Sequence, residues 1–159
     1  DNYCFMHILG FNEELLEKEK TLLTGKIKSL PQLKIIATDI SEDAINISKI
    51  NSGAAGVQDL IEFKVCDFEE TVVPENENGI VFFNPEYGER MGDEVELEET
   101  YSRIGDFMKK KCKGYTGYVF TGNLSLAKKI GLKAKQRIEF YTSKIDCRLL
   151  EYELYSGSK

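Results

Sequence analysis

The sequence has little of what metal sites, disulfide frameworks and membrane spans require. It has one histidine, and its four cysteines are scattered without a CxxC pair, so neither a zinc site nor a dense disulfide framework is indicated. No stretch approaches the roughly 18 apolar residues of a membrane span, and the N-terminus has no basic region followed by an apolar one. We therefore expect a soluble, cytoplasmic protein with free thiols that binds no metal ion and no membrane.

The chain also lacks an excess of positive charge. Its 27 acidic and 21 basic residues give a net charge of -6, the wrong sign for a module that holds nucleic acid by phosphate neutralisation alone. Its 159 residues, 42% of them hydrophobic, suffice for one packed domain over residues 1–159. The chain begins with Asp1 rather than Met, which suggests an excerpt of a longer protein, although processing would have the same effect.

Strand-like and helix-like segments alternate along the chain. Helices are predicted at 11–30, 42–56, 95–111 and 124–131, and strands at 35–37 (ending in Asp39), 61–65, 80–83, 114–123 and, as a hairpin joined near Ser143 and Lys144, within 136–155. Strands separated by helices indicate an α/β fold with a mostly parallel sheet, here with an antiparallel hairpin at one edge.

Polar residues follow three of the predicted strands, where open parallel sheets collect their ligands. Asp39 ends its strand just before a helix, where a carboxylate can accept hydrogen bonds from the hydroxyls of a ribose. It can equally stabilise the dipole of that helix, for which Ser41 is already a good cap. Asp67 could accept a hydrogen bond from an adenine amino group while Phe68 packs beside the ring, but taken alone the motif favours an exposed acidic turn.

The third strand end, Asn84-Pro85-Glu86-Tyr87, is the sharpest motif. Proline forces the residue before it to be extended, which gives the Asn84 side chain and carbonyl a defined direction. Two such oxygens can accept hydrogen bonds from an exocyclic amine, and Tyr87 offers a flat face on which a base can stack. The alternative is a simple Asn-Pro turn with a packed tyrosine. When the four residues are taken without further context, this alternative is favoured.

The wider context resembles a known family. The segments that carry the likeness are, in order, "NPEYGERMG", "LEETYSRIGDFMKK", "GYTGYVFTGN", "KKIGLKAKQRI" and "IDCRLLEYELY". Together they resemble the THUMP-associated RNA methyltransferases, especially the bacterial 23S ribosomal RNA guanine-N2 methyltransferases, over residues 35–155. The upstream segment "FMHILGFNEELLEKE" is also similar.

This resemblance implies a Rossmann-like class I methyltransferase sheet with a reversed C-terminal hairpin, S-adenosylmethionine as methyl donor and RNA as partner. Asn84 to Tyr87 would correspond to the family's Asn-Pro-Pro-Tyr motif, which receives the target amine. The residues implied as cofactor-binding are Asp39, Ile40, Asp67, Phe68 and Asn84, and those implied as catalytic are Asn84, Pro85 and Tyr87.

Two departures from the family pattern stand out. Glu86 replaces the usual second proline, and no two glycines are separated by a single residue, so the glycine-rich donor loop is absent. We expect the first strand, this loop, the first helix and the RNA-binding THUMP domain to lie before Asp1, and residues 1–159 alone to bind the donor poorly. A DNA adenine-N6 or cytosine-N4 methyltransferase, and a non-catalytic remnant or assembly module, are the alternatives.

The remaining candidates carry weaker signals. His7 is expected to be half-buried rather than a ligand or base, and Cys66 to be a small buried residue rather than a nucleophile. The basic run from Lys109 to Lys113 is consistent with RNA contact or with a solvated helix end. Arg90 could meet a phosphate or brace the catalytic turn.

Overall fold

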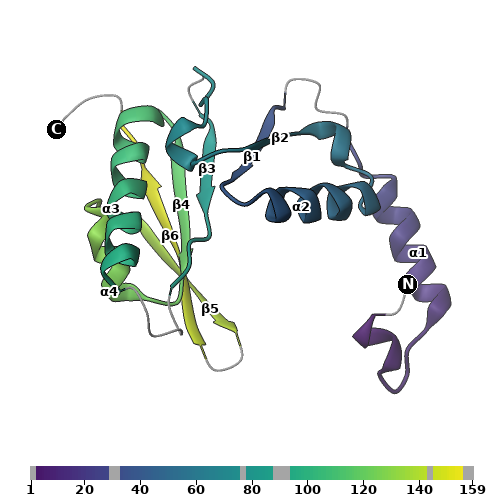
Figure 1. Cartoon of the computed structure of the whole chain (residues 1–159). Helices are drawn as coiled ribbons and strands as arrows, with labels where there is room; N and C mark the ends of the chain where they lie inside the picture. The colour runs from purple at the N-terminus through teal and green to yellow at the C-terminus, as the bar shows by residue number, and fades with distance from the viewer. Residues whose placement is uncertain (1–2, 29–32, 76–77, 88–93, 143–144, 156–159) are drawn as a thin grey trace. The chain divides into compact units, whose positions relative to one another are not determined.

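The computed structural model describes residues 3–28, 33–75, 78–87, 94–142 and 145–155 (Figure 1). The chain divides into two compact units, one of residues 1–37 and 46–64 and the other of residues 38–45 and 65–159. We call them the N-terminal and the C-terminal unit. The three strand-end residues of the sequence analysis, Asp39, Asp67 and Asn84, all belong to the C-terminal unit. In the described part of the chain, no helix is both long and apolar enough to cross a membrane.

The first half of the chain has the predicted order of helix, strand, helix and strand, with two short 3₁₀ helices that were not predicted. The elements are the 3₁₀ helix η1 (Cys4–His7), α1 (Glu13–Thr24), β1 (Ile35–Asp39), α2 (Glu42–Ala54), the 3₁₀ helix η2 (Gln58–Leu60) and β2 (Ile61–Val65). Asn12 caps α1 by accepting a hydrogen bond from the Leu15 N–H at 2.9 Å. No residue of α1 is buried, so the helix predicted at 11–30 is a surface helix, and it ends earlier, at Thr24. Strands β1 and β2 pair with each other in a two-stranded sheet.

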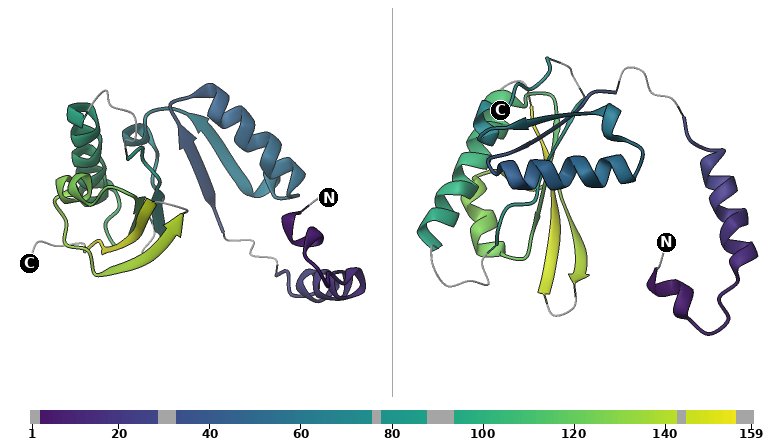
Figure 2. Two further views of the ribbon diagram at one scale, coloured as in Figure 1. Left: turned by 90° about the horizontal axis from the view of Figure 1, so that it is seen from below. Right: turned by 45° about the vertical axis from the view of Figure 1, so that its right-hand side comes forward.

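The second half forms a four-stranded sheet with helices packed on it (Figures 1 and 2). Its elements are the 3₁₀ helix η3 (Phe68–Glu70), β3 (Ile80–Phe83), α3 (Glu94–Lys111), β4 (Thr116–Thr121), α4 (Leu124–Ala127), the 3₁₀ helix η4 (Lys128–Ile130), β5 (Gln136–Thr142) and β6 (Ile145–Glu153). The strand order is β3-β4-β6-β5, with β3 parallel to β4 and β6 antiparallel to both of its neighbours. This confirms the predicted hairpin, whose connection at residues 143–144 lies outside the described residues.

The hydrophobic core lies between α3 and the four-stranded sheet. Tyr101, Ile104 and Met108 recur at helical spacing on one side of α3 and are almost completely buried. The sheet contributes alternate residues of β4 and β6 to this core, such as Val119 and Leu150, because successive side chains of a strand point to opposite faces. The apolar positions that recur at helical spacing in α3 therefore form the side that packs on the sheet.

Helix α3 also packs very closely on η4. At Gly105 the backbone of α3 approaches the carbonyl oxygen of Ile130 so closely that a Cβ atom there would lie far inside van der Waals contact. Only glycine permits this approach, since the neighbouring atom belongs to the backbone and cannot rotate away. The position of η4 against α3 thus depends on one residue without a side chain.

Candidate functional site

The ends of β1 and β2 lie next to each other within the C-terminal unit. The Cys66 N–H donates a hydrogen bond to the carbonyl oxygen of Asp39 at 3.0 Å, so Asp39 and Asp67 follow neighbouring strand ends. One carboxylate oxygen of Asp39 accepts the Ser41 N–H at 2.8 Å, and the Ser41 hydroxyl oxygen accepts the Ala44 N–H at 3.2 Å. The predicted Ser41 cap is confirmed, and Asp39 shapes the turn that leads into α2.

Asp39 and the residue after it are both open to solvent. Only Oδ1 of Asp39 takes part in the turn to Ser41, and the residue as a whole is exposed. Ile40 is 75% exposed and so offers apolar surface directly after the end of β1. A carboxylate for ribose hydroxyls beside an apolar surface suits the adenosyl half of a nucleoside ligand.

Asp67 is held from two sides. Its Oδ1 accepts the Glu69 N–H at 2.9 Å and so caps η3, while its Oδ2 accepts a hydrogen bond from Arg103 Nη2 of α3 at 2.7 Å. The Arg103 hydrogen bond, helped by the Glu69 N–H, holds the pKa of Asp67 below its usual range. The resulting stabilisation is present above the ordinary pKa of an aspartate and is lost as the pH falls through the lowered value.

Phe68, predicted to lie beside an adenine ring, packs among aromatic side chains. Its ring centroid is 5.5 Å from that of Phe83 and 5.8 Å from that of Phe107, both edge-on, and the Arg103 guanidinium carbon lies 5.0 Å from the ring centroid. Phe83 is the last residue of β3 and directly precedes Asn84. Phe68 therefore connects the Asp67 turn to the strand that carries the proposed catalytic motif, and its role toward a base stays a prediction.

The residues of the motif after β3 differ in exposure. Asn84 and Glu86 are exposed, whereas Pro85 and Tyr87 are half-buried. In the core of the same unit, the Tyr101 and Thr121 hydroxyl groups share a buried hydrogen bond of 2.7 Å. Burial raises the pKa of Tyr101, and nearby Tyr87 contributes to the same rise. Tyr87 thus lies near the buried hydroxyl pair that joins α3 to the end of β4, while Asn84 is exposed to solvent.

The remaining sequence candidates include His7, Cys66 and Arg90. His7 is exposed in η1, so the expectation that it is half-buried was wrong, because η1 buries no residue. Cys66 is buried, as predicted. Gly88, Glu89 and Arg90 fall outside the described residues.

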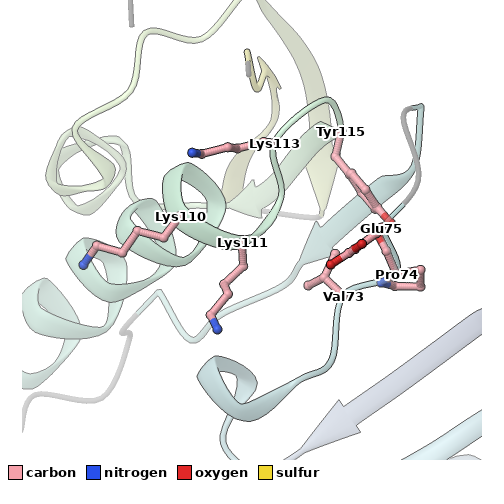
Figure 3. A pocket seen from close by; sticks show the side chains of 7 residues that line it. All are labelled: Val73, Pro74, Glu75, Lys110, Lys111, Lys113 and Tyr115. Atoms are coloured by element: carbon pink, nitrogen blue, oxygen red, sulfur yellow. Dashed lines mark hydrogen bonds between the residues drawn. The ribbon is translucent and has the colours of Figure 1, made fainter. Parts of the chain in front are cut away.

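A surface pocket of about 330 Å³ lies at the end of α3, and none of the predicted site residues lines it. Its cations include Lys110, Lys111 and Lys113, whose ammonium groups point in different directions (Figure 3). Lys110 also pairs with Asp106 at 3.1 Å. The Tyr115 hydroxyl donates a hydrogen bond to the Pro74 carbonyl oxygen at 2.6 Å. The lysines do not converge on one point, and this geometry fits a solvated helix end better than a built anion site.

The residues at the strand ends fit one half of the predicted cofactor. Two carboxylates on neighbouring strand ends, Asp39 and Asp67, match the ribose hydroxyls and the amino group of an adenosine, and the exposed Ile40 supplies apolar surface. The methionine half is usually met by a glycine-rich loop, and the sequence has no pair of glycines separated by one residue. The fit is therefore to the adenosyl group.

Taken together, the mixed sheet, the closing antiparallel hairpin and the polar strand ends define a class I S-adenosylmethionine-dependent methyltransferase fold. The chain belongs to the UPF0020 family, described as "RMKL-like, methyltransferase domain", whose model matches residues 4–151. S-adenosylmethionine is the methyl donor of this class, in agreement with the predicted cofactor.

Similar proteins support the family and the fold. The ribosomal RNA large subunit methyltransferase K/L of Shewanella baltica is 32% identical over 92% of the chain and 20% of its own length. A relative from Synechocystis sp. is 32% identical over 96% of the chain and 40% of its own length. Among solved structures, SMU.472, described as a methyltransferase in complex with SAH, has a TM-score of 0.78 at 20% identity, over 99% of the chain and 41% of its own.

A second solved structure is described as acting on a different nucleic acid. It is described as a predicted N6-adenine-specific DNA methylase from Listeria monocytogenes, with a TM-score of 0.64 at 32% identity over 76% of the chain and 30% of its own length. In all of these comparisons the chain spans less than half the length of the protein it matches.

Proposed function

We propose that the protein is an S-adenosylmethionine-dependent methyltransferase acting on an exocyclic amine of an RNA base, with guanine N2 of 23S ribosomal RNA as the leading target. The observation that carries this proposal is the turn after β3, where an exposed Asn84 is followed by a half-buried Tyr87 near the buried Tyr101–Thr121 pair. The K/L relatives, which are named for the large-subunit ribosomal RNA, support the choice of substrate.

In this proposal the chain's own residues act mainly by positioning. The Asn84 side-chain oxygen and the carbonyl near Pro85 accept hydrogen bonds from the target amine and keep its lone pair free. Tyr87 stacks on the base, which has to leave its helix to reach the turn. When bound, the donor supplies an electrophilic methyl group on its sulfonium. Holding an amine in line with such a group accounts for most of the acceleration that this reaction needs.

We also propose that residues 1–159 form one methyltransferase domain that is incomplete at its N-terminus, within a cytoplasmic protein that has an RNA-binding part elsewhere. The net charge of -6 supports a separate RNA-binding part, because phosphate contacts require cations. The four cysteines, all of them free thiols, are consistent with a reducing compartment.

The role of Asp39 can be tested by donor binding. Asp39→Ala should weaken S-adenosylmethionine binding by the full-length protein roughly 10- to 100-fold, because a charged acceptor for the ribose hydroxyls is lost. Asp39→Asn is the control, since its amide oxygen can still accept the Ser41 N–H and preserve the turn. We expect Asn at this position to cost less than Ala in a calorimetric titration. A loss for Ala with none for Asn would mean that only the turn matters, and this result, like no loss for Ala, would contradict the ribose assignment.

A DNA methyltransferase acting on adenine N6 or cytosine N4 is the second candidate, because the Asn-Pro-x-Tyr turn suits any exocyclic amine and because of the Listeria structure. Methyl transfer from labelled donor to ribosomal RNA and to DNA, measured side by side with the full-length protein, separates the two. Label in guanine of 23S RNA alone supports the proposal, and label in DNA alone overturns it.

A non-catalytic module is the third candidate, supported by Glu86 in the motif and by the missing GxG sequence. It predicts that the full-length protein binds no donor and labels neither nucleic acid. We expect the full-length protein to bind S-adenosylmethionine and residues 1–159 alone to bind it poorly. Absence of binding by the full-length protein would make the non-catalytic reading the better one.

A further inference from the structure

A single cation of α3 holds three consecutive residues that follow β2. Arg103 Nη2 donates to Asp67 Oδ2 at 2.7 Å and to Glu69 Oε2 at 2.7 Å, and Arg103 Nε donates to the same Glu69 oxygen at 3.1 Å. Between these two carboxylates, the guanidinium lies over the ring of Phe68, 5.0 Å from its centroid. We call this group of Arg103, Asp67, Phe68 and Glu69 the Arg103 clamp.

The clamp differs from the ion pair of the same length that Glu98 of α3 makes with Lys129. Lys129 and Glu98 are also 2.7 Å apart, but their side chains are 46% and 42% exposed, and a lysine supplies a point charge. Arg103 and Asp67 are 34% and 28% exposed, and the planar guanidinium serves two acceptors and one ring at once. Because its donors lie in one plane, the guanidinium restricts the orientation of the carboxylates as well as their position, which a single ammonium does not.

The clamp leaves Asp67 able to bind a further donor. A carboxylate offers about four lone-pair positions, and the Glu69 N–H and Arg103 Nη2 use one on each oxygen. The same two contacts fix the plane of the carboxylate, so its remaining lone pairs have a defined direction. The amino group of a planar base can donate a hydrogen bond along this direction, so a carboxylate held in a fixed plane favours such a base.

We propose that Arg103 is a positioning residue that aims the Asp67 carboxylate at the amino group of the adenine of the methyl donor and so makes the site selective for adenosine over its deaminated form. This inference rests on the proposed function, in which Asp67 meets the adenine. It extends the site to a residue of α3 that touches neither the base nor the methyl group.

Affinity for two ligands tests this inference. S-adenosylhomocysteine has the adenine amino group, whereas S-inosylhomocysteine has a carbonyl oxygen in its place, which a carboxylate repels. We expect the full-length protein to prefer S-adenosylhomocysteine. Arg103→Met should weaken S-adenosylhomocysteine binding roughly tenfold while changing S-inosylhomocysteine binding far less. The ratio of the two affinities therefore falls.

Two further variants separate aiming from general structure. Arg103→Lys keeps the charge but loses the planar set of donors, so its affinity ratio should lie between those of the wild type and Arg103→Met. Lys129→Met removes an ion pair of the same length that also involves α3, through Glu98, and should leave the ratio unchanged. In the absence of ligand, amide hydrogen exchange at Glu69 and Glu70, whose N–H groups bond to Asp67, should accelerate in Arg103→Met.

The outcomes are distinguishable. If Arg103→Met weakens both ligands equally, or neither, the residue does not aim Asp67 and the inference is overturned, while the proposed function stands. If the wild type does not discriminate between the ligands and Asp67→Ala changes neither affinity, Asp67 does not meet the adenine, and that part of the proposed function is overturned together with the inference. A lower ratio of the two affinities in Arg103→Met, with an unchanged ratio in Lys129→Met, supports the inference.

Discussion

Asn84→Ala is expected to lower methyl transfer by the full-length protein roughly 100- to 1,000-fold, the size of effect seen when one preorganised hydrogen-bonding group is removed from an active site. Asn84 is exposed at the end of β3, so its side chain is free to meet a substrate and contributes little to the core. Donor affinity should stay close to that of the wild type, because the carboxylates of Asp39 and Asp67 are untouched. Single-turnover transfer from labelled donor, with calorimetry alongside, measures both quantities.

The control for this prediction is Asn46→Ala, which removes another exposed asparagine, in α2, and should leave methyl transfer unchanged. The comparison with Asp39→Ala is equally informative. That variant should lose donor affinity first, and its transfer should recover at high donor concentration. Equal loss of donor binding and of transfer in Asn84→Ala and Asp39→Ala would refute the separate roles given to the two residues.

Gly105→Ala is expected to have the largest effect on stability. An added Cβ meets the Ile130 carbonyl oxygen, and only a movement of η4 away from α3 can relieve that contact. Alanine in a helix interior gains up to about 1 kcal/mol over glycine, but overpacking a rigid core contact costs about 1–3 kcal/mol and occasionally more. We expect a net loss of roughly 2 kcal/mol, or about 4–8 °C in Tm for a domain of this size.

Ser102→Ala is the matched control, because it places the same side chain on an exposed position of α3. It should change Tm by less than about 2 °C, since exposed substitutions usually stay within about 0.5 kcal/mol. Thermal unfolding followed by circular dichroism measures both variants. An unchanged or raised Tm for Gly105→Ala would mean that α3 and η4 separate without cost, contrary to the packing described above.

Local sequence patterns predicted most of the fold, because helices, strands and turns depend largely on the residue types and spacing within each segment. Tyr101, Ile104 and Met108 mark one side of α3 by helical spacing, and that side is the core-facing one. The alternating residues of β5 and β6 predicted a hairpin, which the antiparallel register from Ile145 to Glu151 confirms. The residue types of Asp39 and Ser41 alone predicted the turn into α2.

The contacts of the candidate site could not be predicted in the same way. Arg103 stands 36 residues after Asp67, and in the sequence it is one of several charged residues on a predicted helix. Only the packing of α3 on the sheet brings its guanidinium to the turn after β2. Phe68 likewise looked free to face a ligand, whereas Phe83 and Phe107 lie edge-on to its ring. These contacts depend on tertiary packing, and the spacing of residues along the sequence does not show which elements pack together.

The strand order also bears on how the protein is made. β6 lies between β4 and β5, although both of these precede it in the chain. During synthesis β4 and β5 leave the ribosome first and have no common neighbour until residues 145–153 follow. The four-stranded sheet therefore closes only when its inner strand arrives last, and until then the paired edge of β4 is open to other chains. A chain that ends before Ile145 would therefore have an unfinished sheet and an aggregation-prone edge.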